Sequence, residues 1–440
     1  MAYTAVISRI DTRPIPDADN IVLGTCLGYN VIVSKDTESG SLGVFFEAGG
    51  ALSEEFAVTH DLVRRKNEDG TSAGGYFEEN RRVKAVKMRG VKSEGFWMPI
   101  SCLAYTGADL SKLNVGDQFE ELNGHKICFK YITPATARQG NSNRAVKRGE
   151  TFMFRKQPDI GQLRKELAAI PSGSVVYITE KVHGTSARYG CVLDEVPVPK
   201  WRTFLHKFFP WIDVEPAMEW SYLNGSKNVI LEENPNYVGY YGAEKFRDNA
   251  TKGIWLKKGE ILYGELVGYT ENGTPIMSPQ STKGLKDKNI SKRYGDTMVY
   301  SYGQKQGECE FYVYRIAMVN EDGFATELSW PQVKARSKEL GLKHVPELDS
   351  FILENVRPEV DPEYAEGRRL HLLDTARLLT EDSTGCLPST IDPSHIREGV
   401  VVRYESEYGT GFLKNKSFVF GILEGYAKDD PAAIDLEEIS

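Results

Sequence analysis

The chain has 440 residues, of which 40% are hydrophobic and 26% charged. Such a composition indicates an ordinary globular protein, long enough for two or three domains and a substantial core. The formal net charge of -8 argues against a protein that coats nucleic acid without selectivity. Any affinity for DNA or RNA would therefore have to come from local basic patches.

The cysteines and the N-terminus bear on the compartment. The six cysteines form no Cys-x-x-Cys pair and have no histidine at metal-binding spacing: Cys26, Cys102, Cys128, Cys191, Cys309 and Cys386. Free thiols in a reducing compartment are therefore expected. Arg9 and Asp11 interrupt the N-terminal apolar stretch too early for a secretory signal, and no apolar run approaches a membrane span. We expect a cytoplasmic protein without a membrane partner.

Short apolar runs separated by turn residues fill the first 120 residues. They predict strands at Ala5 to Ile10, Ile21 to Leu27, Asn30 to Val33, Leu42 to Glu47, Arg82 to Lys87 and Gly95 to Ile100. Close spacing and glycine-rich turns favour a small closed β-barrel.

A basic stripe lies within this segment, with two aromatic residues just beyond it. Its members are Arg82, Lys84, Arg89 and Lys92, followed by Phe96 and Trp97. Cations that follow a backbone beside aromatic rings suit a barrel that binds a nucleic-acid strand. An exposed strand face followed by two core aromatics explains the pattern equally well.

The centre of the chain is a strand that ends in a lysine. The run from Val175 to Thr179 alternates apolar and polar residues, which predicts a half-buried strand ending at Glu180 and Lys181. A turn containing Gly184 follows. A lysine beside a turn can simply be solvated, so its significance depends on the rest of the chain.

Four later stretches add chemistry. Glu265 stands in the middle of an apolar strand, where a carboxylate is costly to bury unless it is paired. Tyr314 belongs to an aromatic strand face that could stack on a base, although such a face is more often core. Glu398 opens a β-branched run, and Lys414 and Lys416 lie two residues apart on one face of a last strand. Two like charges side by side are best tolerated where a polyanion such as a triphosphate covers both.

These five stretches, in this order, resemble the motifs of the covalent nucleotidyltransferases, which include polynucleotide ligases and RNA capping enzymes. The segment Lys181-Val-His-Gly-Thr-Ser186 is similar to the Lys-x-His-Gly-Thr form of RNA ligases. The stretches Ile7 to Asn20 and Arg82 to Ile100 resemble the N-terminal OB-like module of Deinococcus-type RNA ligases. The chain also ends soon after Lys416, where DNA ligases and capping enzymes usually carry a further OB domain.

The resemblance implies an α+β fold. An N-terminal OB-like β-barrel would precede a ligase-type, ATP-grasp-like nucleotidyltransferase domain with antiparallel sheets and flanking helices. The expected organisation is a nucleic-acid-binding module over 1–125, a basic linker over 126–156, an adenylyltransferase domain over 157–430 and an acidic tail over 431–440. Helices are expected at Asp159 to Ala169, Pro331 to Gly341 and Glu363 to Leu379.

The resemblance also implies roles for individual residues. Lys181 would attack the α-phosphate of ATP, and Glu398 would organise Mg²⁺ or Mn²⁺. Glu265 would bond the ribose, Tyr314 would stack on adenine, and Lys414 and Lys416 would contact the phosphates. The remaining nucleotide-site residues are expected to be Glu180, His183, Gly184 and Lys227, although a structural histidine and a loop lysine are the ordinary alternatives for two of them. Arg188 is expected to reach the nucleic acid in place of the short Ser186.

The leading hypothesis is an ATP-dependent RNA ligase that seals 3′-OH and 5′-phosphate ends through a lysyl-AMP intermediate. Its expected partner is a nicked duplex of RNA, or of RNA and DNA, and it is expected to act as a monomer. A GTP-dependent capping-type guanylyltransferase is one alternative. A nucleic-acid-binding protein with an inactive nucleotidyltransferase fold is the other.

Two insertions remain open. The aromatic run from Trp201 to Trp211 could cap the nucleotide pocket or touch nucleic acid, although clustered aromatics are usually a local core. The polar segment from Asn272 to Lys305 is either disordered or functional, and its place between two motif strands favours substrate contact.

Overall fold

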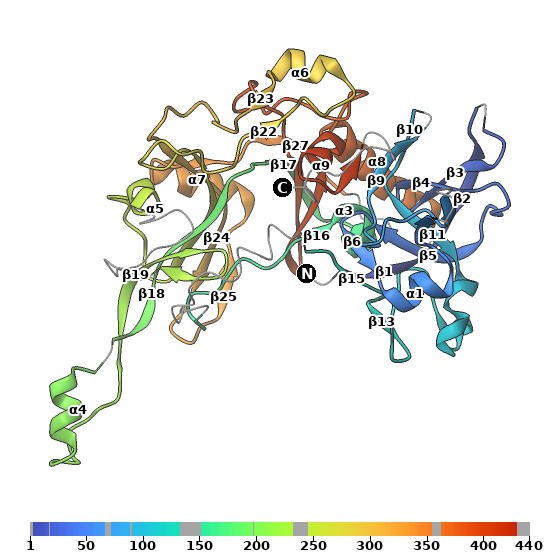
Figure 1. The fold of residues 1–440 in the computed structure, drawn as a ribbon. Coiled ribbons are helices and arrows are strands. Elements are labelled where there is room, and N and C mark those ends of the chain that lie inside the picture. The colour runs from blue at the N-terminus through green and yellow to red at the C-terminus, as the bar shows by residue number, and fades with distance from the viewer. Residues whose placement is uncertain are drawn as a thin grey trace.

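The computed structural model describes residues 3–16, 18–66, 72–88, 90–132, 151–196, 198–231, 245–353 and 362–428. Figure 1 shows two lobes of β-structure with a third sheet between them. The N-terminal lobe is blue, and the sheets that follow it run from green to red. The predicted acidic tail over 431–440 and most of the predicted linker lie outside the described residues.

The N-terminal lobe is built from short strands and a small helix. One sheet has the order β11-β5-β1-β12, and a second has the order β2-β3-β4. Their bounds are β1 Ala5–Arg9, β2 Asp11–Pro14, β3 Ile21–Cys26, β4 Tyr29–Ser34, β5 Leu42–Glu47, β11 Gly95–Pro99 and β12 Gln118–Phe119, with α1 at Glu54–Thr59. The alternating apolar residues of β1 and β5 meet in a core that includes Ile7, Val44 and Phe46. Five of the predicted strands form close to their expected bounds, and the one expected from Arg82 begins at Ala85.

Smaller strand pairs close the lobe. They are β6 Gly50–Leu52 with β15 Cys128–Lys130, β7 Arg64–Lys66 with β8 Ser72–Gly74, β9 Ala85–Met88 with β10 Val91–Ser93, and β13 Glu121–Leu122 with β14 His125–Lys126. Two 3₁₀ helices lie at Ile100–Thr106 and Leu110–Lys112. Because β15 pairs with β6, the strands of this lobe extend to Lys130.

The central sheet carries the motif strands. Its order is β16-β29-β28-β17-β27, and its strands are β16 Gly161–Gln162, β17 Val175–Lys181, β27 Glu347–Ile352, β28 Gly399–Ser406 and β29 Gly409–Lys416. One face of this sheet is apolar and packs on α8 (Pro362–Leu378) and α3 (Leu163–Glu166), burying Val176, Ile178 and Val402. Since side chains alternate along a strand, the other face is left for Lys181 and its neighbours.

The third layer is the largest sheet. It runs β20-β19-β18-β21-β24-β25, with β26 also paired to β24. Its strands are β18 Thr185–Val196, β19 Ala217–Ser226, β20 Ile230–Leu231, β21 Glu260–Gly268, β24 Cys309–Val319, β25 Ala325–Glu327 and β26 Lys343–His344. Helix α7 (Trp330–Glu339) packs on β24, and α5 (Lys245–Ala250) also contacts that strand. Only a short turn, residues 182–184, separates β17 in the central sheet from β18 here.

Two helix predictions are confirmed, by α7 and α8, while the helix expected at Asp159 to Ala169 is one turn of α3 followed by a 3₁₀ turn at Leu167–Ala169. The polar segment 272–305 is structured, with β22 Gln280–Ser281, α6 Lys288–Tyr294 and β23 Thr297–Met298. The described part of the chain contains no helix long and apolar enough to cross a membrane.

The chain returns to the N-terminal lobe at its end. Helix α9 (Phe418–Leu423) follows β29, and β30 (Ala427–Lys428) then pairs in parallel with β9. Ion pairs add to this contact: Arg164 with Glu94 at 2.6 Å, Lys165 with Glu47 at 2.9 Å and Lys92 with Glu381 at 2.9 Å. The N-terminal lobe is therefore fixed against the back of the strand that carries Lys414 and Lys416.

Candidate active site

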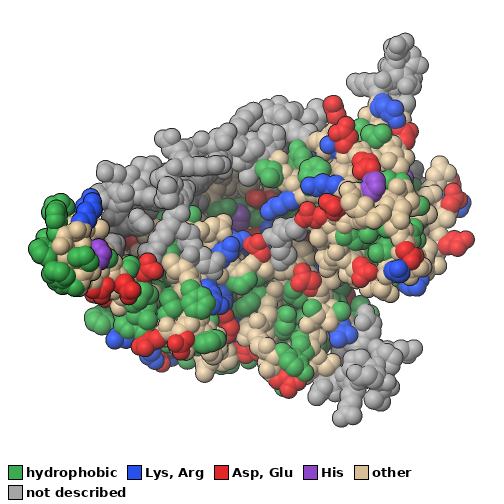
Figure 2. Space-filling model, turned by 90° about the horizontal axis from the view of Figure 1, so that it is seen from below, with side chains coloured by type: hydrophobic (Ala, Val, Ile, Leu, Met, Phe, Trp, Pro, Cys, Tyr) green, Lys and Arg blue, Asp and Glu red, His purple; other side chains and the backbone are tan. Residues whose placement is uncertain are grey.

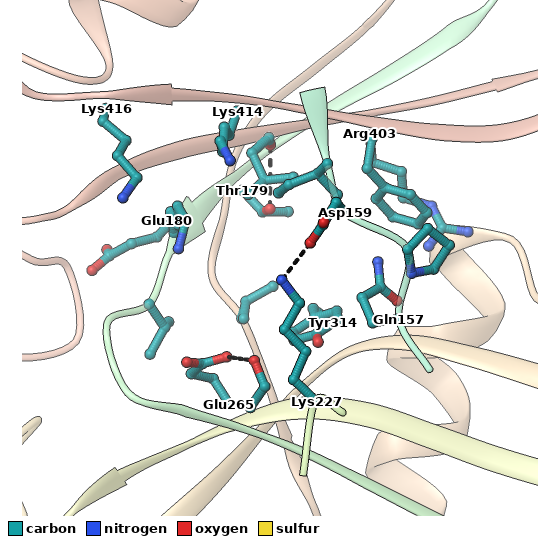
Figure 3. Close-up of a pocket in the computed structure, with 18 of the residues that line it drawn as sticks. Gln157, Asp159, Thr179, Glu180, Lys227, Glu265, Tyr314, Arg403, Lys414 and Lys416 are labelled. Carbon is teal, nitrogen blue, oxygen red and sulfur yellow. Dashed lines mark hydrogen bonds and ion pairs between the residues drawn. The ribbon is translucent and has the colours of Figure 1, made fainter. Parts of the chain in front are cut away.

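A pocket lies between the central sheet and the large sheet. The residues that line it come from every motif strand: Gln157, Pro158, Asp159, Ile160, Thr179, Glu180, Lys181, Val182, Ser186, Lys227, Glu265, Tyr314, Trp330, Val345, Val401, Arg403, Phe412, Lys414 and Lys416. In Figure 3, Lys414 and Lys416 point in from one side, and Glu265, Tyr314 and Lys227 from the other. The pocket thus joins stretches that lie up to 259 residues apart in the chain, from Gln157 to Lys416, which is the convergence that the sequence predicted.

Lys181 stands at the end of β17, opposite Gly399 of β28. Its Nζ lies 2.9 Å from Oε2 of Glu398, and Nζ of Lys416 lies 2.8 Å from Oε1 of the same carboxylate. Glu398 is only 2% exposed. One buried carboxylate therefore holds two of the predicted cations in place.

Electrostatics set the protonation of this group. Burial alone would raise the pKa of Glu398, but Lys181 and Lys416 hold that pKa well below its ordinary range. Burial lowers the pKa of Lys414 to about 8, and the positive charges of Lys416 and Lys181 act in the same direction. Glu398 instead raises the pKa of Lys416, against the effect of burial. Among the described residues, Lys414 makes no hydrogen bond or ion pair, so its ammonium faces the pocket unpaired.

The opposite wall presents a carboxylate and an aromatic ring. Ser186 Oγ donates to Glu265 Oε2 over 3.2 Å, and burial raises the pKa of Glu265 despite the nearby Lys181. Tyr314, from β24, lines the pocket beside them, and burial raises the pKa of its hydroxyl. A hydrogen-bonding carboxylate next to a ring is an arrangement that can bind a ribose and a base.

Gly184 brings the two sheets together. A Cβ at this position would lie 2.2 Å from the carbonyl oxygen of Leu266 and 3.0 Å from Cγ of Glu265. Any other residue would push β21 away from the Lys181 turn. Gly184 therefore acts through close backbone approach and not through a contact of its own.

His183 lies behind the pocket. Its backbone N–H donates to the Tyr302 hydroxyl over 2.6 Å, and its ring packs edge-on against Tyr300 and Phe420. Its Nδ1 lies 3.3 Å from Oε2 of Glu398. The histidine thus supports Glu398 and is not among the residues that line the pocket.

Glu180 points away from Lys181, as alternation along β17 requires. Its carboxylate accepts hydrogen bonds from Ser389 Oγ at 2.6 Å and from Thr390 N at 2.8 Å, and Arg397 Nε lies 3.5 Å away. These partners anchor the segment that leads to Glu398. The Glu180 side chain is therefore occupied by structural contacts.

Lys227 enters the pocket from the loop after β19. It is paired with Asp159, which also lines the pocket, and Lys227 holds the pKa of that carboxyl below its ordinary value (Figure 3). The expected basic contact is thus present, with a carboxylate already beside it.

Several pocket residues carry no signal in the sequence. Trp330 opens α7, and its Nε1 donates to Glu347 over 2.7 Å. Arg403 on β28 donates to Glu405 over 2.6 Å, and burial lowers its pKa. Gln157 completes this end of the pocket. Only the pairing of distant elements brings these side chains to the site.

The structure corrects the predicted nucleic-acid contacts. Arg188 is 1% exposed and donates to the carbonyl oxygens of Phe154 and Ser226, so it is a buried structural residue. Arg82 and Lys84 are each 7% exposed; the first stacks on Tyr131.

The other described cations of the stripe are also paired within the chain. Lys84 pairs with Glu78 at 3.4 Å, and Lys92 pairs with Glu381 and lies over Phe418. Arg89 lies outside the described residues. Most of the stripe therefore holds the fold together, because its cations face carboxylates and rings of the same chain.

The donor set fits a divalent cation that arrives with phosphate. No group of three histidine, cysteine or carboxylate side chains could hold a metal within the described ranges. Mg²⁺, however, is usually bound by one or two carboxylates together with substrate phosphates and water. Glu398, which is ionised, would supply such a carboxylate once Lys181 or Lys416 leaves its ion pair with it.

Two family models match parts of the chain. A family model described as RNA ligase matches residues 174–420, more than half of the chain, and a model of an OB-fold domain matches residues 4–100. A comparison with curated proteins gave no match.

Solved structures share the fold. The RNA ligase of Naegleria gruberi, solved as a lysine-to-methionine mutant with AMP and Mn, is 17% identical with a TM-score of 0.56, covering 94% of this chain and 97% of that one. The same ligase with pyrophosphate is 17% identical with a TM-score of 0.56, covering 95% and 97%. A lysine-to-alanine mutant with ATP and Mn is 16% identical with a TM-score of 0.55, covering 94% and 97%. The α+β fold predicted from the sequence, with its N-terminal OB module, is confirmed.

Proposed function

Since the chain belongs to the RNA ligase family, we propose that it is an ATP-dependent ligase that joins RNA 3′-OH and 5′-phosphate ends through a lysyl-AMP intermediate. One observation carries the proposal. Three ammonium groups, those of Lys181, Lys414 and Lys416, gather at one pocket around a single ionised carboxylate, Glu398. The excess positive charge matches a triphosphate, and the similar Naegleria ligase is solved with ATP and Mn.

In the first step Lys181 Nζ, without its proton, attacks the α-phosphorus of ATP. A nitrogen–phosphorus bond forms, the bond to pyrophosphate breaks, and pyrophosphate leaves. Lys181 must first leave its ion pair with Glu398. In this proposal Lys414 and Lys416 bind the negative oxygens of the phosphates, while Glu265 and Tyr314 bind the ribose and the adenine; that all four line one pocket supports these roles.

In the second step an oxygen of the RNA 5′-phosphate attacks the AMP phosphorus, and Lys181 leaves as an amine. In the third step the 3′-hydroxyl attacks the 5′-phosphate, loses its proton and displaces AMP. Both are in-line displacements that depend on positioning and charge. Glu398 would hold a divalent cation, Mg²⁺ or Mn²⁺, which when bound supplies positive charge that offsets the triphosphate.

The test is the intact mass of the protein after incubation with Mg²⁺ and either ATP or GTP. An increase by one AMP with ATP alone, absent in Lys181→Ala, is the expected result. Treatment with pyrophosphate beforehand removes any AMP carried from expression, and a melting curve shows that the variant is folded.

The same experiment separates the alternatives. A GMP adduct would favour a capping-type enzyme. No adduct with either nucleotide, in folded protein, would favour an inactive binding protein, although an inactive pocket would not need Lys181, Glu265, Lys414 and Lys416 together with Glu398 beside them.

Further parts of the proposal concern the substrate and the assembly. We propose a nicked duplex as the substrate, with the N-terminal lobe along one side of it. Since Arg82 and Lys84 are buried, the path would use exposed lysines such as Lys87 and Lys286, which line one hollow between the lobe and α6. A monomeric state and a cytoplasmic location remain predictions, as do the domain boundaries.

A further inference from the structure

A long hairpin stands out from the large sheet. The last pair that β18 makes with β21 is Gly190 with Ile261, yet β18 continues from Cys191 to Val196 paired only with β19. Cys191 and Val192 are still buried in the body, so at about 3.4 Å per residue the projecting part, Leu193 to Val196, is roughly 14 Å long. Helix α4 (Lys200–His206) caps it, and Figure 1 shows α4 far from the body of the molecule. We call residues 198–216 the arm tip.

The arm tip exposes aromatic rings. Its large apolar side chains that are exposed are all aromatic: Trp201 at 62%, Phe204 at 58%, Phe208 at 64%, Phe209 at 42% and Trp211 at 79%. Phe204 contacts Phe208, and Phe209 contacts Trp211, but these pairs remain open to solvent. The expectation of a local core is therefore wrong. An apolar cluster of this kind on a projecting segment indicates a binding surface.

The charge of the arm tip has one sign over most of its length. Lys200, Arg202 and Lys207 are all exposed, and no acidic residue occurs before Asp213. This is unusual in a chain with a net charge of -8. Rings that can stack on bases, mixed with cations that can contact phosphates, are the features by which proteins bind single-stranded nucleic acid.

The fold connects this surface to the active site. The strand that carries Ser186 at the pocket wall is the same β18 that runs out to α4. Figure 2 views the molecule from the side on which α4 projects, and the surface between the lobes is hollowed there. A two-stranded ribbon ending in a seven-residue helix is only marginally stable without a partner. A substrate that lies across the hollow would supply one.

We propose that the arm tip binds an unpaired stretch of the RNA substrate, several nucleotides from the point of joining. The inference rests on the proposed ligase function and narrows its substrate to RNA with a single-stranded segment beside the joint. Bases inside an intact duplex are already stacked, so the rings of Trp201 and Trp211 can only stack on bases that are unpaired.

The test compares two nicked RNA duplexes, one fully paired and one with an unpaired overhang, by fluorescence anisotropy. For the double variant Trp201→Ala/Trp211→Ala we expect about tenfold weaker binding of the overhang duplex and less than threefold weaker binding of the paired one. The matched control is Trp255→Ala, because Trp255 is 82% exposed outside the arm. Formation of lysyl-AMP is expected to be unchanged in all three proteins.

Other results would overturn the inference. The first is equal affinity of wild type and double variant for the overhang duplex, and the second is an equal loss of affinity for both duplexes. The third is that the double variant loses self-association, or binding to lipid vesicles, and not affinity for RNA. Failure of the proposed function is distinct, because wild type would then form no lysyl-AMP while the binding comparison could still be made. The variant Lys200→Gln/Arg202→Gln leaves the rings in place and is expected to weaken the dependence of overhang binding on salt.

Discussion

Two pairs of basic residues follow the same sequence pattern and lie in opposite environments. Lys414 and Lys416 are two residues apart on β29, and both reach the pocket. Arg82 and Lys84 are two residues apart just before β9, and both are buried against groups of their own lobe. Spacing places each pair on one face of an extended segment, but it does not determine what covers that face.

The difference lies in the number of opposite charges nearby. In the pocket, Glu398 is shared by Lys181 and Lys416 while Lys414 has no ion-pair partner in the described structure. Beside the stripe, Glu78 and Glu381 each face a lysine. A basic residue binds a foreign anion where the fold leaves positive charge in excess, and stabilises the fold where it does not.

The largest effect is expected from removing Glu398, the carboxylate that Lys181 and Lys416 share. In Glu398→Ala, Lys181, Lys416 and His183 lose their common partner. We therefore expect lysyl-AMP formation to slow by about 100-fold or more. Quenched-flow measurement at saturating ATP and Mg²⁺ reads this rate. Glu398→Gln keeps the shape of the side chain and tests its charge alone. The control is Glu407→Ala, because Glu407 is exposed in the turn between β28 and β29. A rate within threefold of wild type in Glu398→Ala would show that the charge balance of the pocket is unimportant.

The pocket was predictable because each motif strand carries its own pattern. Alternation alone puts Lys181 opposite the apolar face of β17, and Lys414 and Lys416 on the same side of β29. What the sequence could not show depends on tertiary pairing: Trp330 and Arg403 at the pocket, or Ser389 as the partner of Glu180. The order of residues does not reveal which distant carboxylate will meet a given cation.

The same reason explains why two predictions outside the pocket are wrong. The sequence favours Arg188 as a substitute for the short Ser186, yet its side chain is buried against Gly225 of β19, and backbone carbonyls accept its hydrogen bonds. The run from Trp201 to Trp211 has the composition of a core, but its rings are exposed at the end of a ribbon that projects from the large sheet. Clustered aromatics predict burial only where another element can reach them.

A second prediction concerns a cation that is buried between the lobes. Arg164 pairs with Glu94 at 2.6 Å, donates to Asn415 and lies over Tyr29. Arg164→Ala would leave Glu94 buried without its partner, so we expect the free energy of unfolding to fall by about 3 kcal/mol. Urea unfolding followed by fluorescence measures it.

The control for this variant is Lys112→Ala, which removes an ion pair whose lysine is 81% exposed, and no measurable change in the free energy of unfolding is expected there. If both variants lost the same stability, burial would not distinguish the two kinds of cation. RNA affinity below the unfolding transition should not change in either.

A third prediction uses the pKa of Lys414. Its pKa in the folded protein is lowered to about 8, so its ammonium loses its proton as the pH rises through that value. ATP binding that depends on this charge should be constant below about pH 7, about twofold weaker at pH 8 and about tenfold weaker at pH 9. Calorimetric titration of ATP at a series of pH values checks it. Lys414→Arg, which stays charged, should remove the dependence, and a persistent decline in that variant would assign the effect to another group.

The smallest expected effect is on the salt dependence of RNA affinity, which should differ between variants of Lys87 and Lys84 in the N-terminal lobe. Lys84 is buried beside Glu78, whereas Lys87 on β9 is exposed and lines the hollow that also contains Lys286. If RNA passes that hollow, Lys87→Gln should reduce the slope of log affinity against log salt by about one, because one phosphate contact is lost. Lys84→Gln should leave the slope unchanged and lower stability by about 1 kcal/mol. A change of slope in Lys84→Gln would show that Lys84 leaves its ion pair with Glu78 and contacts RNA. Burial in the free protein would then not separate Lys84 from Lys414 and Lys416.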